Sequence, residues 1–342
     1  MQAVRFHAHG GPDVLTYEDA PDPAVAPGGV VVRVRACALN HLDLWQRRGI
    51  ERVTIPMPHI SGADVAGEIV EVGEGVEGLA VGTRVMLQPG LSCGQCRWCL
   101  AGLDNRCGRY DVLGYQSPGG YAERVAVPAA NVIRLPDHVD FVSAAAFPLT
   151  FLTAWHMLLT RATLTERDTV LVVAAGSGVG QAAVQIARRF GARVIATAGG
   201  QAKLAQAKAL GADEVIDHYA EDVVARVRAV TNRAGVDIVV EHVGGATWDR
   251  SVRCLARGGR LVICGATSGH HAALDLRHLF ARQLSLLGSY MGTKAELLRV
   301  AELFFAGHVR PVIDRTLPLS EAGQAHARLE SGSQFGKIVL EV

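Results

Sequence analysis

The chain lacks several features that would assign it to a class at once. No apolar run is long enough to span a bilayer, and the most apolar segments, VVRVRACAL and TVLVVAAG, have only strand length. The formal net charge is +1, which gives no argument for nucleic acid or an anionic membrane as a partner. The N-terminus, MQAVRFHAHGGPDVL, lacks the charged start and apolar core of a signal peptide. We therefore expect a cytoplasmic protein without a membrane or nucleic-acid partner.

Cysteine is scarce except in one turn-rich segment, GLSCGQCRWCLAGLDNRCGRY. This segment holds Cys93, Cys96, Cys99 and Cys107, four of the seven cysteines. Four thiolates at this spacing can surround one Zn²⁺ tetrahedrally. Disulfides are the competing interpretation, but they need an oxidising compartment. Because four thiolates leave no open coordination position, we predict one structural Zn²⁺ in a lobe at residues 90–110, with the chemistry elsewhere.

At 342 residues the chain is long enough for two domains. Its first third alternates short apolar segments with turn signals, which is typical of a compact β domain. Strands and helices then alternate, which predicts an α/β fold with a doubly wound parallel sheet. The predicted strands are 169–175, 193–198, 214–217, 236–243, 260–266 and 283–290, with helices at 179–191 and 203–212. Because the final strand can return to the first domain, we expect domains at 1–150 with 291–342, and at 151–290.

A glycine-rich turn joins the predicted strand 169–175 to the helix that follows it. Such a turn lets the backbone approach a pyrophosphate, which the N–H groups at a helix N-terminus bind. Ala175 and Ser177 replace two glycines of the G-x-G-x-x-G pattern, so the turn alone is ambiguous. The surrounding strand–helix series favours a dinucleotide site. The residues expected at the pyrophosphate are Gly176, Ser177, Gly178, Val179 and Gly180.

The end of the second strand bears on the choice of cofactor. An acid there would bind the adenosine ribose and repel a 2′-phosphate, but this strand ends in Thr197 and small residues without an acid. Lys203 follows in the next helix, and His218 after the third strand can line the adenosine site. We expect NADP(H) to be favoured over NAD(H). If Lys203 is only a solvated helix residue, the site would be indifferent.

Further cofactor contacts are expected where strands end, because an open α/β sheet binds its ligand at that edge. The remaining predicted cofactor residues are Thr153, Val243, Gly244, Gly265, Ala266, Ser289, Tyr290 and Met291. Of these, Tyr290 is also a candidate for an apolar substrate pocket, together with Trp45 and Phe147.

The chain resembles the medium-chain dehydrogenase/reductase superfamily, the zinc alcohol dehydrogenases and quinone oxidoreductases, along essentially its whole length. The resemblance implies a GroES-like β-rich catalytic domain, a Rossmann domain and a homodimer, with a tetramer as the alternative. Besides the cysteine lobe and the glycine turn, it rests on GADVAGEIVEVGEGV (62–76), GTRV (82–85), GGYAERVAVP (119–128), LTFLTAWHML (149–158), KALGADEVID (208–217), GVDIVVEHVG (235–244) and FGKIVLEV (335–342).

The resemblance also locates a missing metal site. Alcohol-oxidising members of the family hold a catalytic zinc through a Cys, a Gly-His-Glu and a second Cys. Here the first position is Asn40, the Gly-His-Glu reads Gly62-Ala63-Asp64, and the third position falls near Leu149. A catalytic zinc needs about three protein ligands and an open position, so we expect none here. An unorthodox site that uses His41 and His59 is a minor alternative.

Without a metal to polarise a carbonyl, reduction of an activated alkene is easier than oxidation of an alcohol. We expect NADPH-dependent hydride transfer to a small molecule with a carbonyl-conjugated double bond, a quinone or an enone. The predicted catalytic residues are Asn40, a hydrogen-bond donor to the substrate carbonyl or the nicotinamide carboxamide, His41, a proton donor, and Asp43. Structural roles are the alternatives for two of them: Asp43 only ties its loop, and His41 contacts the cofactor phosphates. Two alternative functions remain. One is an alcohol or aldehyde dehydrogenase with an atypical catalytic zinc or none, and the other is a nucleotide-binding protein with a structural or sensing role and weak activity.

Overall fold

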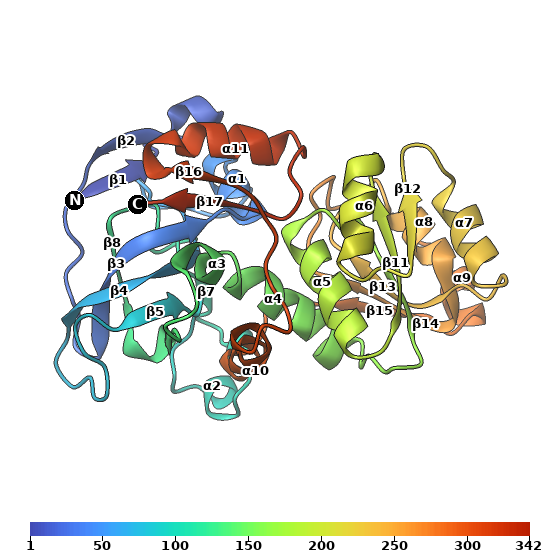
Figure 1. Cartoon of the computed structure of the whole chain (residues 1–342), viewed down its shortest axis with the longest axis horizontal. Helices are drawn as coiled ribbons and strands as arrows, with labels where there is room; N and C mark the ends of the chain where they lie inside the picture. Colours follow the sequence, from blue (N-terminus) through green and yellow to red (C-terminus); the bar gives the residue numbers. More distant parts are fainter. The chain divides into compact units, whose positions relative to one another are not determined.

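The computed structural model describes residues 1–342, which form two compact units (Figure 1). Unit 1 consists of Met1–Leu149, Thr293–Phe305 and Arg310–Val342. Unit 2 consists of Thr150–Gly292 and Ala306–Val309. The two ends of the chain therefore belong to the same unit.

Unit 1 is built around a seven-stranded sheet. The strands of unit 1 are β1 (Gln2–Arg5), β2 (Thr16–Asp19), β3 (Gly29–Ala38), β4 (Asp64–Val72), β5 (Arg84–Leu87), β6 (Gly90–Leu91), β7 (Asp111–Val112), β8 (Arg124–Pro128), β9 (Val132–Arg134), β16 (Ile313–Pro318) and β17 (Lys337–Glu341). Of these, β1 pairs with β2 and β6 pairs with β7 in two separate two-stranded sheets. The sheet order is β16-β17-β3-β4-β5-β9, and β8 also pairs with β3. Strand β17 runs antiparallel to β3, with Val339 opposite Ala38. The last strand of the chain thus lies beside the strand that leads to the predicted catalytic segment.

Unit 1 also contains five α-helices and four 3-10 turns. They are α1 (His41–Arg48), α2 (Arg97–Leu100), α3 (Phe141–Ala145), α10 (Lys294–Phe305) and α11 (Ala322–Glu330), with 3-10 turns at Pro12–Val14, Asp104–Arg106, Ala129–Asn131 and Leu319–Glu321. Helix α3 begins at Asp140, whose side chain accepts a hydrogen bond from the Ser143 backbone N–H at 2.7 Å. Helix α1 ends at Gly49, whose φ of 90° suits glycine and stops the helix.

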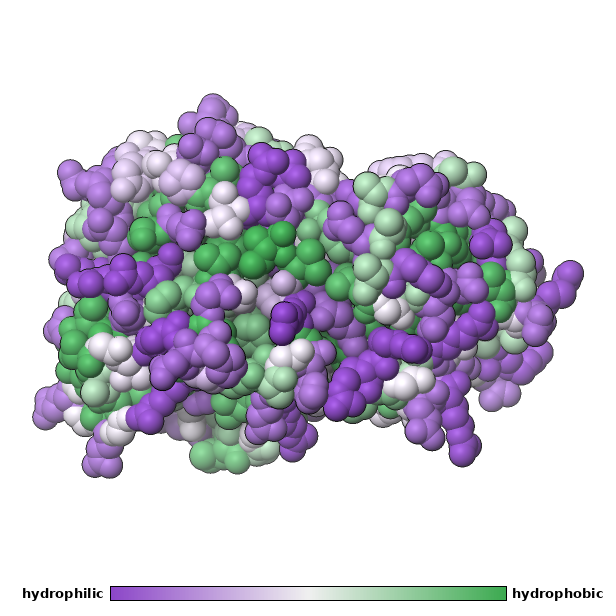
Figure 2. Space-filling model, in the orientation of Figure 1, coloured by the Kyte–Doolittle hydropathy of each residue, from purple (hydrophilic) through white to green (hydrophobic).

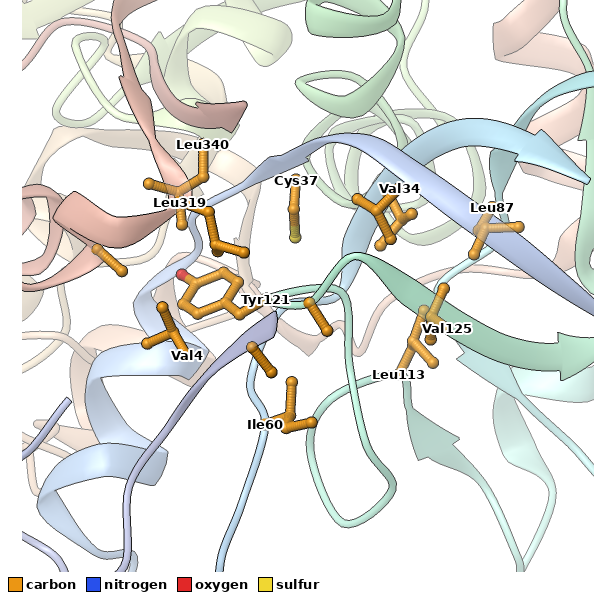
Figure 3. Close-up of a cluster of buried hydrophobic side chains, with 14 of the residues drawn as sticks. Val4, Val34, Cys37, Ile60, Leu87, Leu113, Tyr121, Val125, Leu319 and Leu340 are labelled. Carbon is orange, nitrogen blue, oxygen red and sulfur yellow. The ribbon is translucent and has the colours of Figure 1, made fainter. Parts of the chain in front are cut away.

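The core of unit 1 forms because β-branched residues alternate along β3 and face a layer of other apolar side chains. Figure 3 shows the Tyr121 ring inside this layer, close to Cys37 of β3 and Val4 of β1. Tyr121 is completely buried. Each large apolar side chain buried in this way contributes about 1.5–3 kcal/mol to stability. The phenol is therefore a fixed point from which its hydroxyl reaches the polar cluster described below.

Unit 2 contains a six-stranded, all-parallel sheet with helices on both faces (Figure 1). The strands are β10 (Thr169–Val172), β11 (Arg193–Ala198), β12 (Glu214–Asp217), β13 (Val236–Glu241), β14 (Leu255–Ile263) and β15 (Ser285–Gly288). The helices are α4 (Pro148–Trp155), which begins in unit 1 and continues as a π-helical turn at His156–Arg161, α5 (Gly178–Arg189), α6 (Gln201–Ala209), α7 (Val223–Val230), α8 (Trp248–Cys254) and α9 (Leu276–Ala281). The strand order is β12-β11-β10-β13-β14-β15, so the direction of winding reverses between β10 and β13.

This sheet confirms the predicted doubly wound parallel fold, with differences at the ends of elements. The predicted strand 169–175 ends at Val172, because Ala174 takes a φ of +50° and turns the chain. The predicted strand 236–243 ends at Glu241, whose side chain then binds the backbone N–H groups that follow it. Strand β14 begins at Leu255, five residues before its predicted start at 260.

The chain contains no helix that is long and apolar enough to cross a membrane. Figure 2 shows hydrophilic and hydrophobic residues intermixed on the face that it draws.

Candidate functional site

Three residues far apart in sequence meet inside unit 1. Asn40 follows β3, Asp64 begins β4, and Leu149 lies in the first turn of α4. The Asn40 Nδ2 donates to Asp64 Oδ2 at 3.0 Å, and the Leu149 backbone N–H donates to Asp64 Oδ1 at 2.8 Å. The positions that the family resemblance assigns to metal ligands therefore surround one buried carboxylate.

A fourth residue, Lys337, completes this cluster, and the sequence analysis did not single it out. Lys337 is the first residue of β17, next to Ile338, whose carbonyl accepts from the Leu39 N–H at 2.9 Å. Its Nζ donates to Asn40 Oδ1 at 2.7 Å and to Asp64 Oδ2 at 2.9 Å. The available signal was a lone cation at the start of an apolar strand, KIVLE, where it is buried with the core. We call Asn40, Asp64, Leu149 and Lys337 the lysine cluster.

The donor set of the lysine cluster does not fit a catalytic zinc. Both oxygens of Asp64 already accept hydrogen bonds, and one of them faces the ammonium group of Lys337. The side chains of Ala63 and Leu149 offer no ligand atom. The Cys37 thiol interacts with Asp64, but burial raises its pKa well above the usual value, so it is not a thiolate. A second cation at this point would also face the buried charge of Lys337. The residues present thus bind the ammonium group of the Lys337 side chain in place of a metal ion.

The two histidines of the alternative metal site do not converge on Asp64. His59 is buried, and its Nε2 lies 3.0 Å from the Gly114 carbonyl oxygen. Burial lowers the pKa of His59. His41 is the first residue of α1, and its ring centroid lies 6.4 Å from that of Trp45. The cysteine cluster is the single group in the chain in which three or more His, Cys, Asp or Glu ligand atoms converge.

Asp43 ties the start of α1 to the core of unit 1. Its Oδ2 accepts from the Asn40 backbone N–H at 2.8 Å and from the Tyr121 hydroxyl at 3.0 Å. Its Oδ1 is buried without a partner. Burial raises the pKa of Asp43 to about 6, although both hydrogen bonds favour the ionised form.

A buried polar network extends from Asp43 to α11. The Tyr121 hydroxyl lies 3.2 Å from His326 Nε2, and His326 Nδ1 lies 3.4 Å from Arg47 Nη1. Arg47 also pairs with Glu330, near the surface. Burial, reinforced by the Arg47 charge, lowers the pKa of His326 to about 3, so this imidazole is neutral. The network fixes α1, which carries the predicted catalytic residues, against the C-terminal helix.

The four cysteines form a compact cluster in unit 1. Their Sγ atoms all lie within 4.8 Å of one another. The Cys96–Cys99 and Cys93–Cys99 separations are 3.6 and 3.9 Å. A zinc tetrahedron with bonds of about 2.3 Å has sulfur–sulfur separations of about 3.8 Å. All seven cysteines of the chain are free thiols, so the cluster fits the predicted structural Zn²⁺ and contains no disulfide.

In unit 2, the glycine-rich turn has the geometry expected at a helix N-terminus. Ser177 is the N-cap of α5, and its Oγ accepts from the Gly180 N–H at 2.9 Å. A Cβ on Gly180 would lie 2.4 Å from the Ala174 carbonyl oxygen, so the close approach requires glycine. Thr197 Oγ1 accepts from the Ala174 N–H at 3.0 Å, which links the turn to the end of β11.

The region after β11 holds an acid that the sequence analysis did not consider. Asp217, at the end of the neighbouring β12, accepts from the Gly200 N–H at 3.2 Å and from the Tyr219 N–H at 3.0 Å. A carboxylate therefore lies beside the glycines that end β11. Positive charge also lies near this region. Burial lowers the pKa of His218, and the nearby charges of Arg250 and Lys203 lower it further.

The other predicted cofactor residues all lie in unit 2, and most follow a strand. Thr153 is the exception: it lies in α4 and its buried Oγ1 has no protein partner. Met291 takes a φ of +50°. The strand-end residues are Val243 and Gly244 after β13, Gly265 and Ala266 after β14, and Ser289, Tyr290 and Met291 after β15.

Comparisons with known proteins support the same organisation. The family model described as alcohol dehydrogenase GroES-like domain matches residues 26–137, and the model described as zinc-binding dehydrogenase matches residues 178–306. An NAD-dependent alcohol dehydrogenase of Sulfolobus acidocaldarius is 33% identical, with all of both chains aligned. The chain belongs to the medium-chain dehydrogenase/reductase superfamily.

Within this superfamily the chain is similar to proteins with different names. A quinone oxidoreductase of Pseudomonas aeruginosa is 32% identical over 98% of both chains. A solved structure described as an NAD-dependent alcohol dehydrogenase is 48% identical, covers all of both chains and has a TM-score of 0.97. The predicted family, the fold class and an NAD(P)-dependent oxidoreductase activity are therefore confirmed. Superfamily membership leaves the substrate open, so the substrate must be inferred from the residues of the site.

Proposed function

We propose that this oxidoreductase reduces quinones, enones or other carbonyl-conjugated alkenes with NADPH and without a catalytic metal. The lysine cluster carries the proposal: Asp64 is hydrogen-bonded to Lys337 and Asn40, and neighbouring residues supply no zinc ligand. This set of side-chain groups is a carboxylate, an amide and an ammonium group. They form a hydrogen-bonded ion pair and leave no ligand set for a metal ion.

An activated alkene suits such a site better than an alcohol does. Its β carbon is already electrophilic, so hydride can add there while negative charge moves to the carbonyl oxygen. Hydrogen-bond donors and fixed positive charge stabilise such an enolate. The enolate then takes a proton at its α carbon. A bound nicotinamide cofactor would supply the hydride for this reduction. Alcohol oxidation needs the hydroxyl to lose its proton, a step that a metal ion promotes strongly in related chemistry.

We assign different roles to the three predicted catalytic residues. The amide nitrogen of Asn40 lies 3.0 Å from Asp64 Oδ2 and 3.4 Å from the Ala38 carbonyl oxygen, and its oxygen accepts from Lys337. Asn40 therefore holds the lysine cluster together. Asp43 holds the start of α1 through the Asn40 backbone N–H. His41, partly exposed at the first position of α1, is the proposed proton donor.

The preference for NADPH is part of the proposal. It rests on the missing acid at the end of β11 and on the positive charges of Lys203 and Arg250 near His218. Asp217 beside Gly200 favours NADH instead, as does the name of the Sulfolobus relative. Both oxygens of Asp217 accept backbone N–H groups, which leaves them less able to repel a phosphate.

A second candidate is an alcohol or aldehyde dehydrogenase without a catalytic metal. The solved structure with 48% identity is described as an NAD-dependent alcohol dehydrogenase, which supports the alcohol as substrate. To separate the two candidates, initial rates are measured with NADPH and NADH on a quinone, an enone, an enoyl thioester and an aldehyde, and with NADP⁺ and NAD⁺ on primary and secondary alcohols. Each assay is repeated after a brief incubation with 1,10-phenanthroline that leaves the zinc of the cysteine cluster in place, as elemental analysis of the treated protein checks.

The proposal predicts NADPH turnover of at least one quinone or alkene at a rate that the chelator leaves unchanged. Turnover restricted to alcohols and aldehydes supports the second candidate. Loss of activity with the chelator and recovery with zinc would contradict both.

We also propose that the protein is a homodimer of the cytoplasm. Strand β15 is an edge of the sheet in unit 2, and the adjacent α9 exposes Leu276 and Phe280 by 66% and 69%. Light scattering should give twice the chain mass, and a monomeric mass would contradict the dimer.

The free thiols need a reducing compartment. Fractionation of the source cells checks that location, and recovery outside the cytoplasm would refute it.

A further inference from the structure

A histidine next to the glycine-rich turn contacts the residue that begins α5. His242 Nε2 lies 2.7 Å from Ser177 Oγ, the same oxygen that accepts from the Gly180 N–H. His242 follows β13 and is only 8% exposed. Its second ring nitrogen, Nδ1, is buried and has no protein partner.

The neighbouring acid does not supply that partner. Glu241 Oε1 accepts three backbone N–H groups, from His242, Val243 and Gly244. Its Oε2 accepts the hydroxyls of Thr247 and Ser251. The Glu241 carboxylate is therefore fully used in shaping the turn after β13. A buried nitrogen without a partner costs stability, and a ligand group at this edge of the sheet would relieve that cost.

The position of His242 in the sheet indicates which part of a dinucleotide it meets. Strands β10 and β13 are neighbours, and the winding direction reverses between them. A pyrophosphate binds at the N-terminus of the helix after the first strand, which here is α5 with Ser177 as its N-cap. The adenosine half then lies toward β11 and β12, so the nicotinamide half lies toward β13. His242 is on that second side.

The contacts that the pair can make depend on which ring nitrogen of His242 carries the hydrogen. Burial lowers the pKa of His242, so the ring is neutral and carries one N–H. If Nε2 carries this hydrogen, it donates to Ser177 Oγ, and the Ser177 hydroxyl hydrogen is free to donate elsewhere. Nδ1 is then a hydrogen-bond acceptor. In this tautomer Ser177 has a donor hydrogen at the pyrophosphate position, and Nδ1 is an unpartnered acceptor at the end of β13.

We propose that His242 and Ser177 together position the nicotinamide half of the cofactor. The Ser177 hydroxyl donates to the pyrophosphate, and His242 Nδ1 accepts a hydrogen bond from a hydroxyl of the nicotinamide ribose. The inference rests on dinucleotide binding by unit 2, and it is independent of the substrate class proposed above. His242 is a cofactor-positioning residue in this proposal.

The test compares two ligands that differ in the second ribose. ADP and ADP-ribose share the adenosine half and the pyrophosphate, but the terminal phosphate of ADP carries additional negative charge. The change in the ratio of their dissociation constants between wild type and variant therefore isolates the ribose contact. The ratio is measured by calorimetry, or by displacement of the reduced dinucleotide that the enzyme prefers. The variants are His242→Leu, His242→Asn and His242→Gln. Asn places a polar atom near the Nδ1 position, whereas Gln places one near the Nε2 position. His218→Leu, on the adenosine side, is the control.

His242→Leu should weaken ADP-ribose binding about fivefold to tenfold more than ADP binding, the effect of one lost hydrogen bond. His242→Asn should restore most of that difference, and His242→Gln should not. His218→Leu should weaken both ligands equally. Equal weakening of both ligands in His242→Leu, or no weakening, would overturn the proposal. A substrate panel without alkene turnover would leave this result unaffected, so the two proposals fail separately.

Discussion

The Nζ atom of Lys337 lies 2.9 Å from Asp64 Oδ2, and the two side chains are 2% and 0% exposed. Removing two such charges from water costs several kcal/mol for each ion, which their attraction and hydrogen bonds must offset. Asn40 bridges the pair by donating to the carboxylate and accepting from the ammonium group. The lysine cluster therefore supplies its own positive charge at the point where the resemblance places a metal.

Removing one member of this pair should destabilise the protein strongly. In Lys337→Met, Asp64 stays buried without its cation, and we expect a loss of about 3–5 kcal/mol in unfolding free energy. Urea denaturation followed by circular dichroism measures it. Adding Asp64→Leu to Lys337→Met removes the uncompensated charge and should recover most of the loss. A single variant as stable as the wild type would show that the pair is not charged and buried as described.

Asp43 should make stability depend on pH. Its pKa in the folded protein is about 6, above the ordinary value of 3.8, so the folded state binds the proton more tightly than the unfolded state does. Its ionisation therefore costs stability, and the cost grows as the pH rises from about 4 through 6. Relative to Asp43→Asn, the wild type should lose about 2 kcal/mol between pH 4 and pH 7. Denaturation curves measure the unfolding free energy of both proteins at each pH. A difference between the two proteins that stays constant with pH would contradict this assignment.

The cysteine cluster should hold one zinc that has a structural role. Cys96→Ser should lower the zinc content from about one to near zero per chain and lower the melting temperature, because three thiolates bind zinc less tightly than four. Elemental analysis and a thermal melt measure both effects. The control variant is Cys264→Ser, because Cys264 lies outside the cluster. It should keep about one zinc per chain. Full zinc content in Cys96→Ser would show that the cluster is not the zinc site.

His41 should matter for proton transfer. Replacing it with Ala should lower kcat for an alkene substrate about a hundredfold, within the range that general acid catalysis contributes. Added imidazole should restore part of the rate, and the pH profile of the wild type should show one limb that the variant lacks. An unchanged kcat removes His41 from the mechanism and leaves solvent as the proton source.

Lys203 should contribute to the choice of cofactor. Lys203→Ala should raise KM for NADPH about tenfold and leave KM for NADH nearly unchanged, because a 2′-phosphate would lose a charge-assisted hydrogen bond. Lys208→Ala, in the same helix α6, is the matched control and should change neither constant. A wild-type enzyme that strongly prefers NADH would refute the preference itself, and Asp217 would then be the residue to test.

The sequence predicted the parts of this protein that depend on local pattern. Alternating strands and helices indicated the doubly wound sheet, and the spacing from Cys93 to Cys107 indicated the metal lobe, because these signals lie within short segments. The missing zinc ligands were also visible at single positions, such as Asn40 and Ala63.

The residues that the sequence did not reveal are those whose partners are far away in the chain. Lys337 lies 273 positions from Asp64, and His242 lies 65 positions from Ser177. Only the antiparallel pairing of β17 with β3 brings Lys337 to the cluster, and only the neighbouring ends of β10 and β13 bring His242 to the turn. Asp217 was likewise hidden, because it approaches Gly200 from the next strand.

The zinc content of the active enzyme tests the central claim most directly. The protein is purified after growth in zinc-supplemented medium, and native mass spectrometry counts the ions on each chain. Since the lysine cluster cannot ligate zinc and the cysteine cluster can, we predict one zinc per chain. Two zinc ions per chain, with the second lost in an Asp64→Asn variant, would contradict the account.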